Sequence, residues 1–162
     1  MNKVTVLIIC FLIILILTAC TMKNNIYTDF CGFQKDDFTI VEESDSHSGV
    51  HSDGFYYLVL DCSENQEKVL ELLTDWRELP LSENLDLIMY GGEKDGISYE
   101  YNLAEKFDVP RIENGYYYFY DRHSESIDCN DDSGLFDRNS FNFSFALYDV
   151  KTQKLYYFEY DT

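Results

Sequence analysis

Residues 141–160 contain the pattern that most restricts the fold of this chain. Apolar side chains occupy every second position at its start, beginning with Phe141 and Phe143, and polar or small residues stand between them. A period of two places the apolar residues on one face of a β-strand. The pattern stops at 149–154 and a second aromatic run follows at 155–160. The sequence therefore predicts an antiparallel hairpin with its turn at 149–154.

Three further segments have the composition of strands. Tyr and Phe predominate at 55–62 and at 116–122, and these segments follow the turn dipeptides Asp53-Gly54 and Asn114-Gly115. A weaker strand pattern covers residues 38–43. The chain holds 14 Tyr, 12 Phe and one Trp among 162 residues, and aromatic residues favour strands. Together with the C-terminal hairpin, these segments are the expected strands of the sheet.

Two helices are expected between the strands. Ser63 is followed three residues later by Gln66, which is the spacing of a capping box. The apolar residues that then fall on one helical face are Val69, Leu70, Leu72, Leu73 and Trp76. A second short helix is expected at 82–90, where two glycines follow. The predicted fold is α+β: an antiparallel β-sheet with one or two helices packed on one face, which leaves a tyrosine-bearing surface on the other.

The first twenty residues have the pattern of a secretion signal. A short start with one positive charge, at Lys3, precedes an apolar run over residues 4–19 whose only polar members are Thr5 and Thr18. As a helix, this run would extend about 24 Å, which is less than the ~30 Å hydrocarbon core of a membrane. A signal peptide therefore describes the segment better than a membrane-spanning helix does.

The end of the apolar run, Leu17-Thr18-Ala19-Cys20, resembles the lipobox of bacterial lipoproteins. The resemblance implies that the Cys20 thiol receives a diacylglycerol and that a peptidase cleaves just before it. We then expect a signal peptide at 1–19, a lipidated N-terminus with a short tether at 20–25, and a single α+β domain at 26–162. The alternative is an uncleaved helix or an ordinary secretory signal. The expected location is the cell membrane, lipid-anchored on its extracytoplasmic face.

Beyond the signal, the chain resembles uncharacterised small lipoproteins and secreted proteins of Gram-positive bacteria. The segments that carry this resemblance are residues 120–126 and 140–162. It implies no activity, substrate or site. The formal net charge of −18 excludes nucleic acid as a partner, because affinity for phosphate backbones comes mainly from Lys and Arg.

A histidine-containing segment is the first candidate site. A three-residue loop at 48–50 would set His47 opposite His51 in a hairpin. The same register would set Asp45 opposite Asp53. Two imidazoles and two carboxylates in this arrangement predict a divalent metal site. The alternative is an open, solvated loop without a metal.

A second candidate is the acidic segment that contains Asp128, Asn130 and Asp132. It is similar to a calcium-binding EF-hand loop, which needs glycine at its sixth position and glutamate at its twelfth. Glycine is seventh here, at Gly134, and Asn139 is twelfth. The segment therefore predicts an acidic surface loop with at most weak affinity for Ca²⁺.

The sequence contains no glycine-rich phosphate loop, no G-x-S-x-G elbow and no H-E-x-x-H motif. A non-enzymatic binding module for a protein, peptide or glycan ligand is thus the leading hypothesis, with no cofactor unless a divalent metal binds. A metal-binding protein or metal-dependent enzyme that uses His47 and His51 is one alternative, and an immunity or exclusion factor at the membrane is another. Cys31, Cys62 and Cys129 remain as an odd number of cysteines in the expected domain, for which we expect no obligatory disulfide.

Overall fold

The structure of the chain is a computed structural model that describes residues 31–47 and 53–162. The expected signal peptide and its Cys20 lie outside the described residues. Within the described part, no helix is both long enough and apolar enough to cross a membrane.

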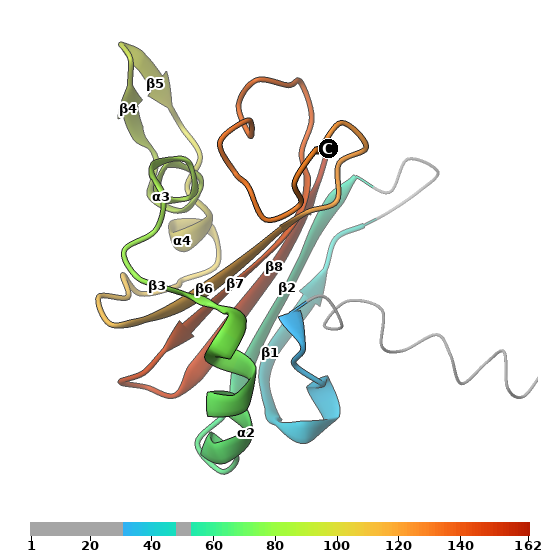
Figure 1. The fold of residues 1–162 in the computed structure, drawn as a ribbon, viewed down its shortest axis with the longest axis vertical. Coiled ribbons are helices and arrows are strands. Elements are labelled where there is room, and N and C mark those ends of the chain that lie inside the picture. The colour runs from blue at the N-terminus through green and yellow to red at the C-terminus, as the bar shows by residue number, and fades with distance from the viewer. Residues whose placement is uncertain (1–30, 48–52) are drawn as a thin grey trace, which may run out of the picture.

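An antiparallel sheet of six strands organises the described chain, in the spatial order β1-β2-β8-β7-β6-β3 (Figure 1). Its strands are β1 (Thr39–Asp45), β2 (Gly54–Asp61), β3 (Arg77–Glu78), β6 (Gly115–Asp121), β7 (Asn142–Asp149) and β8 (Lys154–Asp161). The five predicted strands are confirmed, each within one or two residues at its ends. The C-terminal hairpin is also confirmed, because β7 and β8 pair from Asn142↔Asp161 to Asp149↔Lys154.

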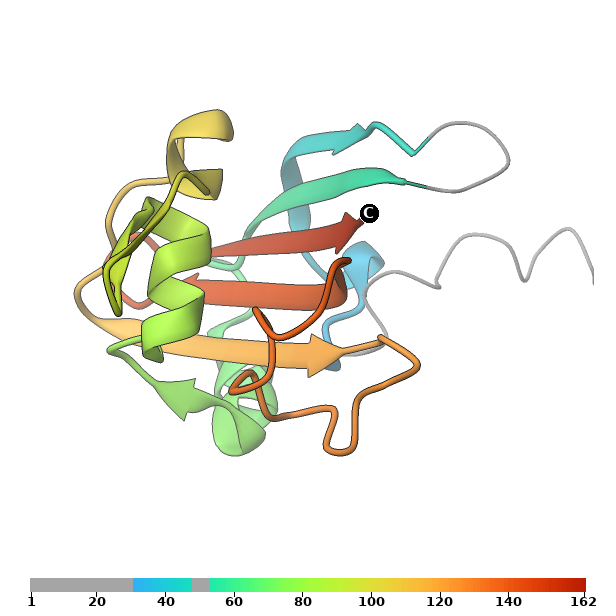
Figure 2. The same cartoon turned by 90° about the horizontal axis from the view of Figure 1, so that it is seen from above.

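Short elements complete the fold. The helices are α2 (Gln66–Leu72), α3 (Glu83–Tyr90) and α4 (Leu103–Lys106), with single 3₁₀ turns η2 (Lys35–Asp37) and η3 (Leu73–Asp75). Strands β4 (Gly92–Lys94) and β5 (Ile97–Tyr99) form a separate hairpin that stands away from the large sheet (Figure 1). The long connection from β6 to β7, residues 122–141, lies at one end of the sheet (Figure 2).

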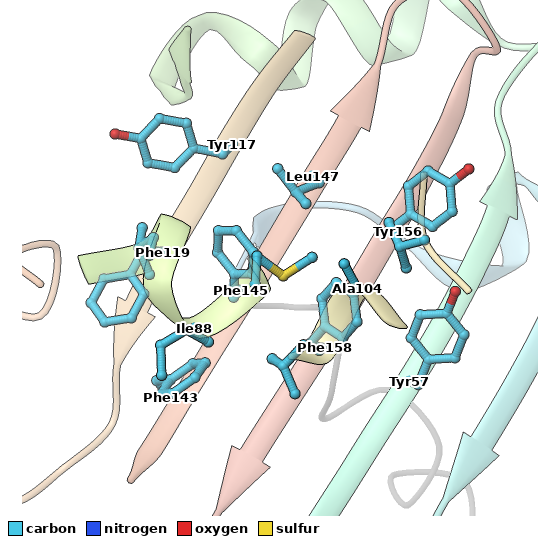
Figure 3. Packing of buried hydrophobic residues seen from close by; sticks show 14 of the residues in the cluster. Tyr57, Ile88, Ala104, Tyr117, Phe119, Phe143, Phe145, Leu147, Tyr156 and Phe158 are labelled. Carbon is cyan, nitrogen blue, oxygen red and sulfur yellow. The ribbon is translucent and has the colours of Figure 1, made fainter. Parts of the chain in front are cut away.

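The α+β class is confirmed, and the helices cover both faces of the sheet. Helices α3 and α4 pack on one face, where Ile88 and Ala104 lie over Phe143, Phe145 and Phe158 (Figure 3). Helix α2 packs on the opposite face, which is named the α2 face below, through the apolar residues Val69, Leu73, Leu58 and Leu155. The expected exposed tyrosine surface is therefore absent from the described sheet, because each face is covered by a helix. A strand with aromatic residues at successive positions presents apolar rings on both faces of the sheet, so both faces must be covered by other elements.

The first helix differs from its prediction. It begins at Gln66 with Asn65 as N-cap, whereas the Ser63 amide donates to Asp61 Oδ1 (2.9 Å) in the turn before it. The expected apolar stripe is also incomplete, because Leu70 is 67 % exposed. Leu70 directly follows the buried Val69, and successive residues lie about 100° apart around a helix axis, so the Leu70 side chain turns away from the sheet.

The second helix agrees with its prediction at both ends. Ser82 is its N-cap, and its hydroxyl accepts a hydrogen bond from the Leu85 amide (3.3 Å). Gly91 ends it with φ of 68°, in the left-handed region that favours glycine.

Candidate functional site

A cleft of about 630 Å³ lies at the outer edge of β6, next to the end of α2. It is bounded by η3 and β3 on one side and by the chain around Cys31 and Asn130 on the others. The residues that line it are Cys31, Gly32, Glu71, Leu72, Asp75, Trp76, Arg77, Tyr117, Tyr118, Phe119 and Asn130. Clefts of this size with an aromatic lining are the usual place for ligand binding.

The cleft exists because β3 is too short to cover the edge of β6. Strand β3 pairs only with Tyr116 and Tyr117. Farther along β6, the Asp121 amide donates to the Cys129 carbonyl (2.7 Å), which closes the edge again. Phe119 lies between these two closures, with no described strand opposite it on that side.

Aromatic rings form the floor of the cleft. The Trp76 ring, 8 % exposed as a residue, lies 5.7 Å from the Tyr118 ring and 5.4 Å from the Phe33 ring, centroid to centroid. Burial raises the pKa of the Tyr118 phenol, and the neighbouring Cys31 thiol raises it further. The phenol therefore stays neutral, and the floor is uncharged.

The rim of the cleft is negative. Glu71 and Asp75 are exposed, and neither carboxylate forms an ion pair with a described residue. Arg77 is the cationic residue of the lining, but its guanidinium is occupied: it donates to the Asn130 carbonyl and lies 3.7 Å from Asp132. The cleft therefore offers unpaired negative charge above an aromatic floor.

His47 lies between two carboxylates at the end of the sheet. Its Nδ1 is 2.7 Å from Asp45 Oδ1, and its Nε2 is 3.1 Å from Asp161 Oδ2. Arg122 also donates to Asp161, through Nη2 to Oδ1 (2.9 Å). Both ring nitrogens of His47 therefore already have a carboxylate within hydrogen-bonding distance.

The predicted hairpin register around His47 is wrong. Asp45 pairs with Tyr56, not with Asp53, and the Ser46 amide donates to the Phe55 carbonyl (2.9 Å). Asp53, the residue just before β2, is exposed.

His51 lies outside the described residues, so the metal hypothesis that includes it stays a prediction. In residues 31–47 and 53–162, no group of three or more His, Cys, Asp or Glu side chains is arranged to hold a metal ion.

The three residues of the expected calcium loop have separate partners. Asp128 Oδ1 accepts from the Asn130 amide (2.9 Å) within the loop. Asp132 is 6 % exposed and accepts from the Ser82 hydroxyl, so its carboxylate points into the protein. The Asn130 carbonyl faces Arg77 at the cleft. Weak calcium binding by this segment stays a prediction.

Sequence reasoning missed a buried carboxylate on the α2 face. Glu159 is 2 % exposed and accepts a hydrogen bond from the Tyr157 hydroxyl (2.6 Å), while Arg122 Nη2 lies 3.9 Å away. Burial raises the pKa of Glu159. The signal was present in the alternation of β8, where Glu159 follows Leu155 and Tyr157 at a position that should be apolar.

The described residues contain three cysteines, Cys31, Cys62 and Cys129. Cys62 is fully buried, and burial raises the pKa of its thiol to about 12. Cys31 lines the cleft. Cys129 is half-buried and directly precedes Asn130, another residue of the cleft lining. Their environments therefore differ although their chemistry is the same.

A comparison of the chain with protein-family models, with curated proteins and with solved structures found no match. Function is therefore inferred from the residues of the chain itself.

Proposed function

We propose that the chain is a lipid-anchored, extracytoplasmic binding protein whose ligand docks in the cleft at the edge of β6. The anchor is the lipid on Cys20, as the lipobox Leu17-Thr18-Ala19-Cys20 implies. The observation that supports the binding function is the cleft itself, which combines an aromatic floor with an unpaired acidic rim.

The chemistry of the lining favours binding over catalysis. Trp76 and Tyr118 supply flat apolar surface, and Glu71 and Asp75 supply charge. Among the described residues that line the cleft there is no histidine and no serine, so the lining lacks the most frequent general acid–base side chain and a serine nucleophile. We therefore propose a non-enzymatic role.

The anchor is tested by replacing Cys20 with serine in cells that express the full chain. We expect the variant to leave the membrane fraction, whereas Cys10→Ser, a change inside the expected signal, should stay membrane-bound. Mass spectrometry of the wild type should find an N-terminus at Cys20 with an added lipid. Membrane retention of Cys20→Ser with an uncleaved N-terminus would show that the apolar helix is the anchor.

The binding site is tested by photo-cross-linking on intact cells. A photoreactive amino acid at position 71 lies in the cleft, and the same residue at position 67 lies on the same helix outside it. We expect one dominant cross-linked species from position 71 that is missing from position 67. Equal cross-linking from both positions would contradict a ligand site in the cleft.

A further inference from the structure

We propose that the ligand of the cleft is an extended peptide segment that pairs its backbone with Phe119 and carries lysine or arginine on either side of the paired residue. This inference rests on the proposed function and names the class of ligand.

The open edge of β6 supplies the backbone partner. In a strand, the N–H and C=O of one residue point to one side, and those of the next residue point to the other. The Gly115 carbonyl accepts from the Leu79 amide (3.0 Å) on the outer side of β6, and the Asp121 amide bonds outward to Cys129. Phe119 has the same parity, so its N–H and C=O also point outward, into the part of the edge that β3 leaves uncovered.

Arg122, the residue that follows β6, is consistent with this parity on the other side of the strand. The Arg122 amide donates inward to the Asn142 carbonyl of β7 (2.7 Å). The Phe119 side chain is buried in the core under α3, so the ligand would meet the main chain of Phe119 and not its ring. One residue of an added strand can form both hydrogen bonds of an antiparallel pair with it.

Successive side chains of the added peptide strand point to opposite faces of the sheet. The residue opposite Phe119 points its side chain to the α3 side, and its two neighbours point theirs to the α2 face. On that face lie Trp76, Tyr118 and the carboxylates of Glu71 and Asp75. A lysine or arginine stem can lie along the rings while its charge reaches the carboxylates.

Charge selects the ligand among extended peptides. Arg77 is already paired with Asp132 and also lies over the Tyr117 ring, 5.6 Å from its centroid, so it does not neutralise the rim. A cationic side chain would supply the missing partner of Glu71 and Asp75, whereas an acidic one would be repelled.

Tryptophan fluorescence tests this inference directly, because Trp76 is the only tryptophan of the chain. Purified full-length protein in detergent is titrated with the capped pentapeptide Ala-Lys-Val-Lys-Ala. The first control peptide carries glutamate at both lysine positions, and the second carries an N-methyl group on the central valine. We expect a saturable change in Trp76 fluorescence with the lysine peptide only. The glutamate peptide is repelled by Glu71 and Asp75, and the N-methylated peptide lacks the N–H that would donate to the Phe119 carbonyl.

A pair of double variants tests the position of the charge. Glu71→Gln with Asp75→Asn should weaken the lysine peptide roughly tenfold, as expected for the loss of two exposed ion pairs. The control double variant, Glu64→Gln with Glu67→Gln, removes the same amount of charge. Glu64 precedes α2 and Glu67 lies in it, and neither lines the cleft, so this variant should leave the affinity unchanged.

Four results would overturn the inference: no binding of the lysine peptide, equal binding of the glutamate peptide, equal binding of the N-methylated peptide, or equal weakening by both double variants. The proposed function is judged separately. If no peptide binds but position 71 still cross-links specifically in cells, the ligand is of another class and the binding function stands. If position 71 also fails, the proposed function fails with it.

Discussion

The two faces of the sheet differ in the polarity of the side chains that strands β7 and β8 bury on them. On the α3 side, Phe145 of β7 pairs with Phe158 of β8, and both side chains are fully buried. One residue earlier along β7, Ser144 pairs with Glu159 on the α2 face, and this pair is buried as well. Neighbouring cross-strand pairs are thus apolar on one face and polar on the other.

The buried polar groups on the α2 face indicate where a function is to be expected. Buried rings contribute free energy of folding in proportion to their apolar area, whereas a buried carboxylate costs free energy unless it is hydrogen-bonded. Apolar packing stabilises the fold on both sides, through Phe145 and Phe158 on the α3 side and through Leu58 and Leu155 on the α2 face. The α2 face holds the buried Glu159, the carboxylate-bound His47 and the floor of the cleft at Trp76. We therefore expect function on the α2 face.

The largest expected effect comes from Phe145→Ala on the α3 side. The change leaves a cavity among fully buried rings, so the free energy of unfolding should fall by about 3–5 kcal/mol in urea denaturation. Ser144→Ala is the matched control on the other face. Its Oγ has no hydrogen-bond partner in the described structure, so its cost should stay below about 1 kcal/mol. Equal costs would contradict the division between the faces.

A smaller, pH-dependent effect is expected at Glu159. Its pKa is raised by burial above the ordinary 4.5 of a glutamate, so the folded state holds a proton that the unfolded state releases as the pH rises. The stabilising contribution of this proton is complete below 4.5 and is lost as the pH rises through the folded-state pKa. Glu159→Gln should remove this fall in the unfolding free energy, while exposed Glu67→Gln should keep it. Denaturant titrations across that pH range measure both slopes, and parallel slopes for wild type and Glu159→Gln would contradict the buried carboxylate.

The smallest effect is expected in zinc binding at the end of the α2 face. Zinc would have to displace a hydrogen bond between His47 and Asp45 or Asp161, so calorimetry at neutral pH should show no tighter zinc binding to wild type than to the His47→Ala, His51→Ala double variant. Tighter binding to the wild type would establish the predicted metal site and would assign this end of the face to metal chemistry.

The sequence predicted the strands well because their alternation is local. The runs at 116–122 and 141–148 carry their period within a few residues, and the structure places β6 and β7 there. The placement of the helices could not be predicted, because aromatic residues on both faces of a strand do not say which helix covers which face. The two-residue β3 was missed for a related reason, since so short a strand has no period to detect.

The candidate site depended on contacts that are distant in the sequence. His47 was identified, but its partner Asp161 is 114 residues away, and a hairpin prediction could find only neighbours such as Asp53. The cleft was not predicted at all, because Trp76 and Asn130 meet only through the pairing of β3 with β6. Local sequence patterns thus predicted the secondary-structure elements, whereas the residues of the candidate site are brought together by the order of the strands in the sheet.

The central claim, that the cleft on the α2 face binds the ligand, is tested most directly by nuclear magnetic resonance. The ¹⁵N-labelled protein is titrated with the Ala-Lys-Val-Lys-Ala peptide, and the shifts of all amide signals are followed. We predict the largest changes at the Trp76 indole N–H and at the amides of Asp75 and Phe119, with little change at Phe145. Largest changes in the acidic connection at 122–141, with the Trp76 indole signal unmoved, would contradict the claim.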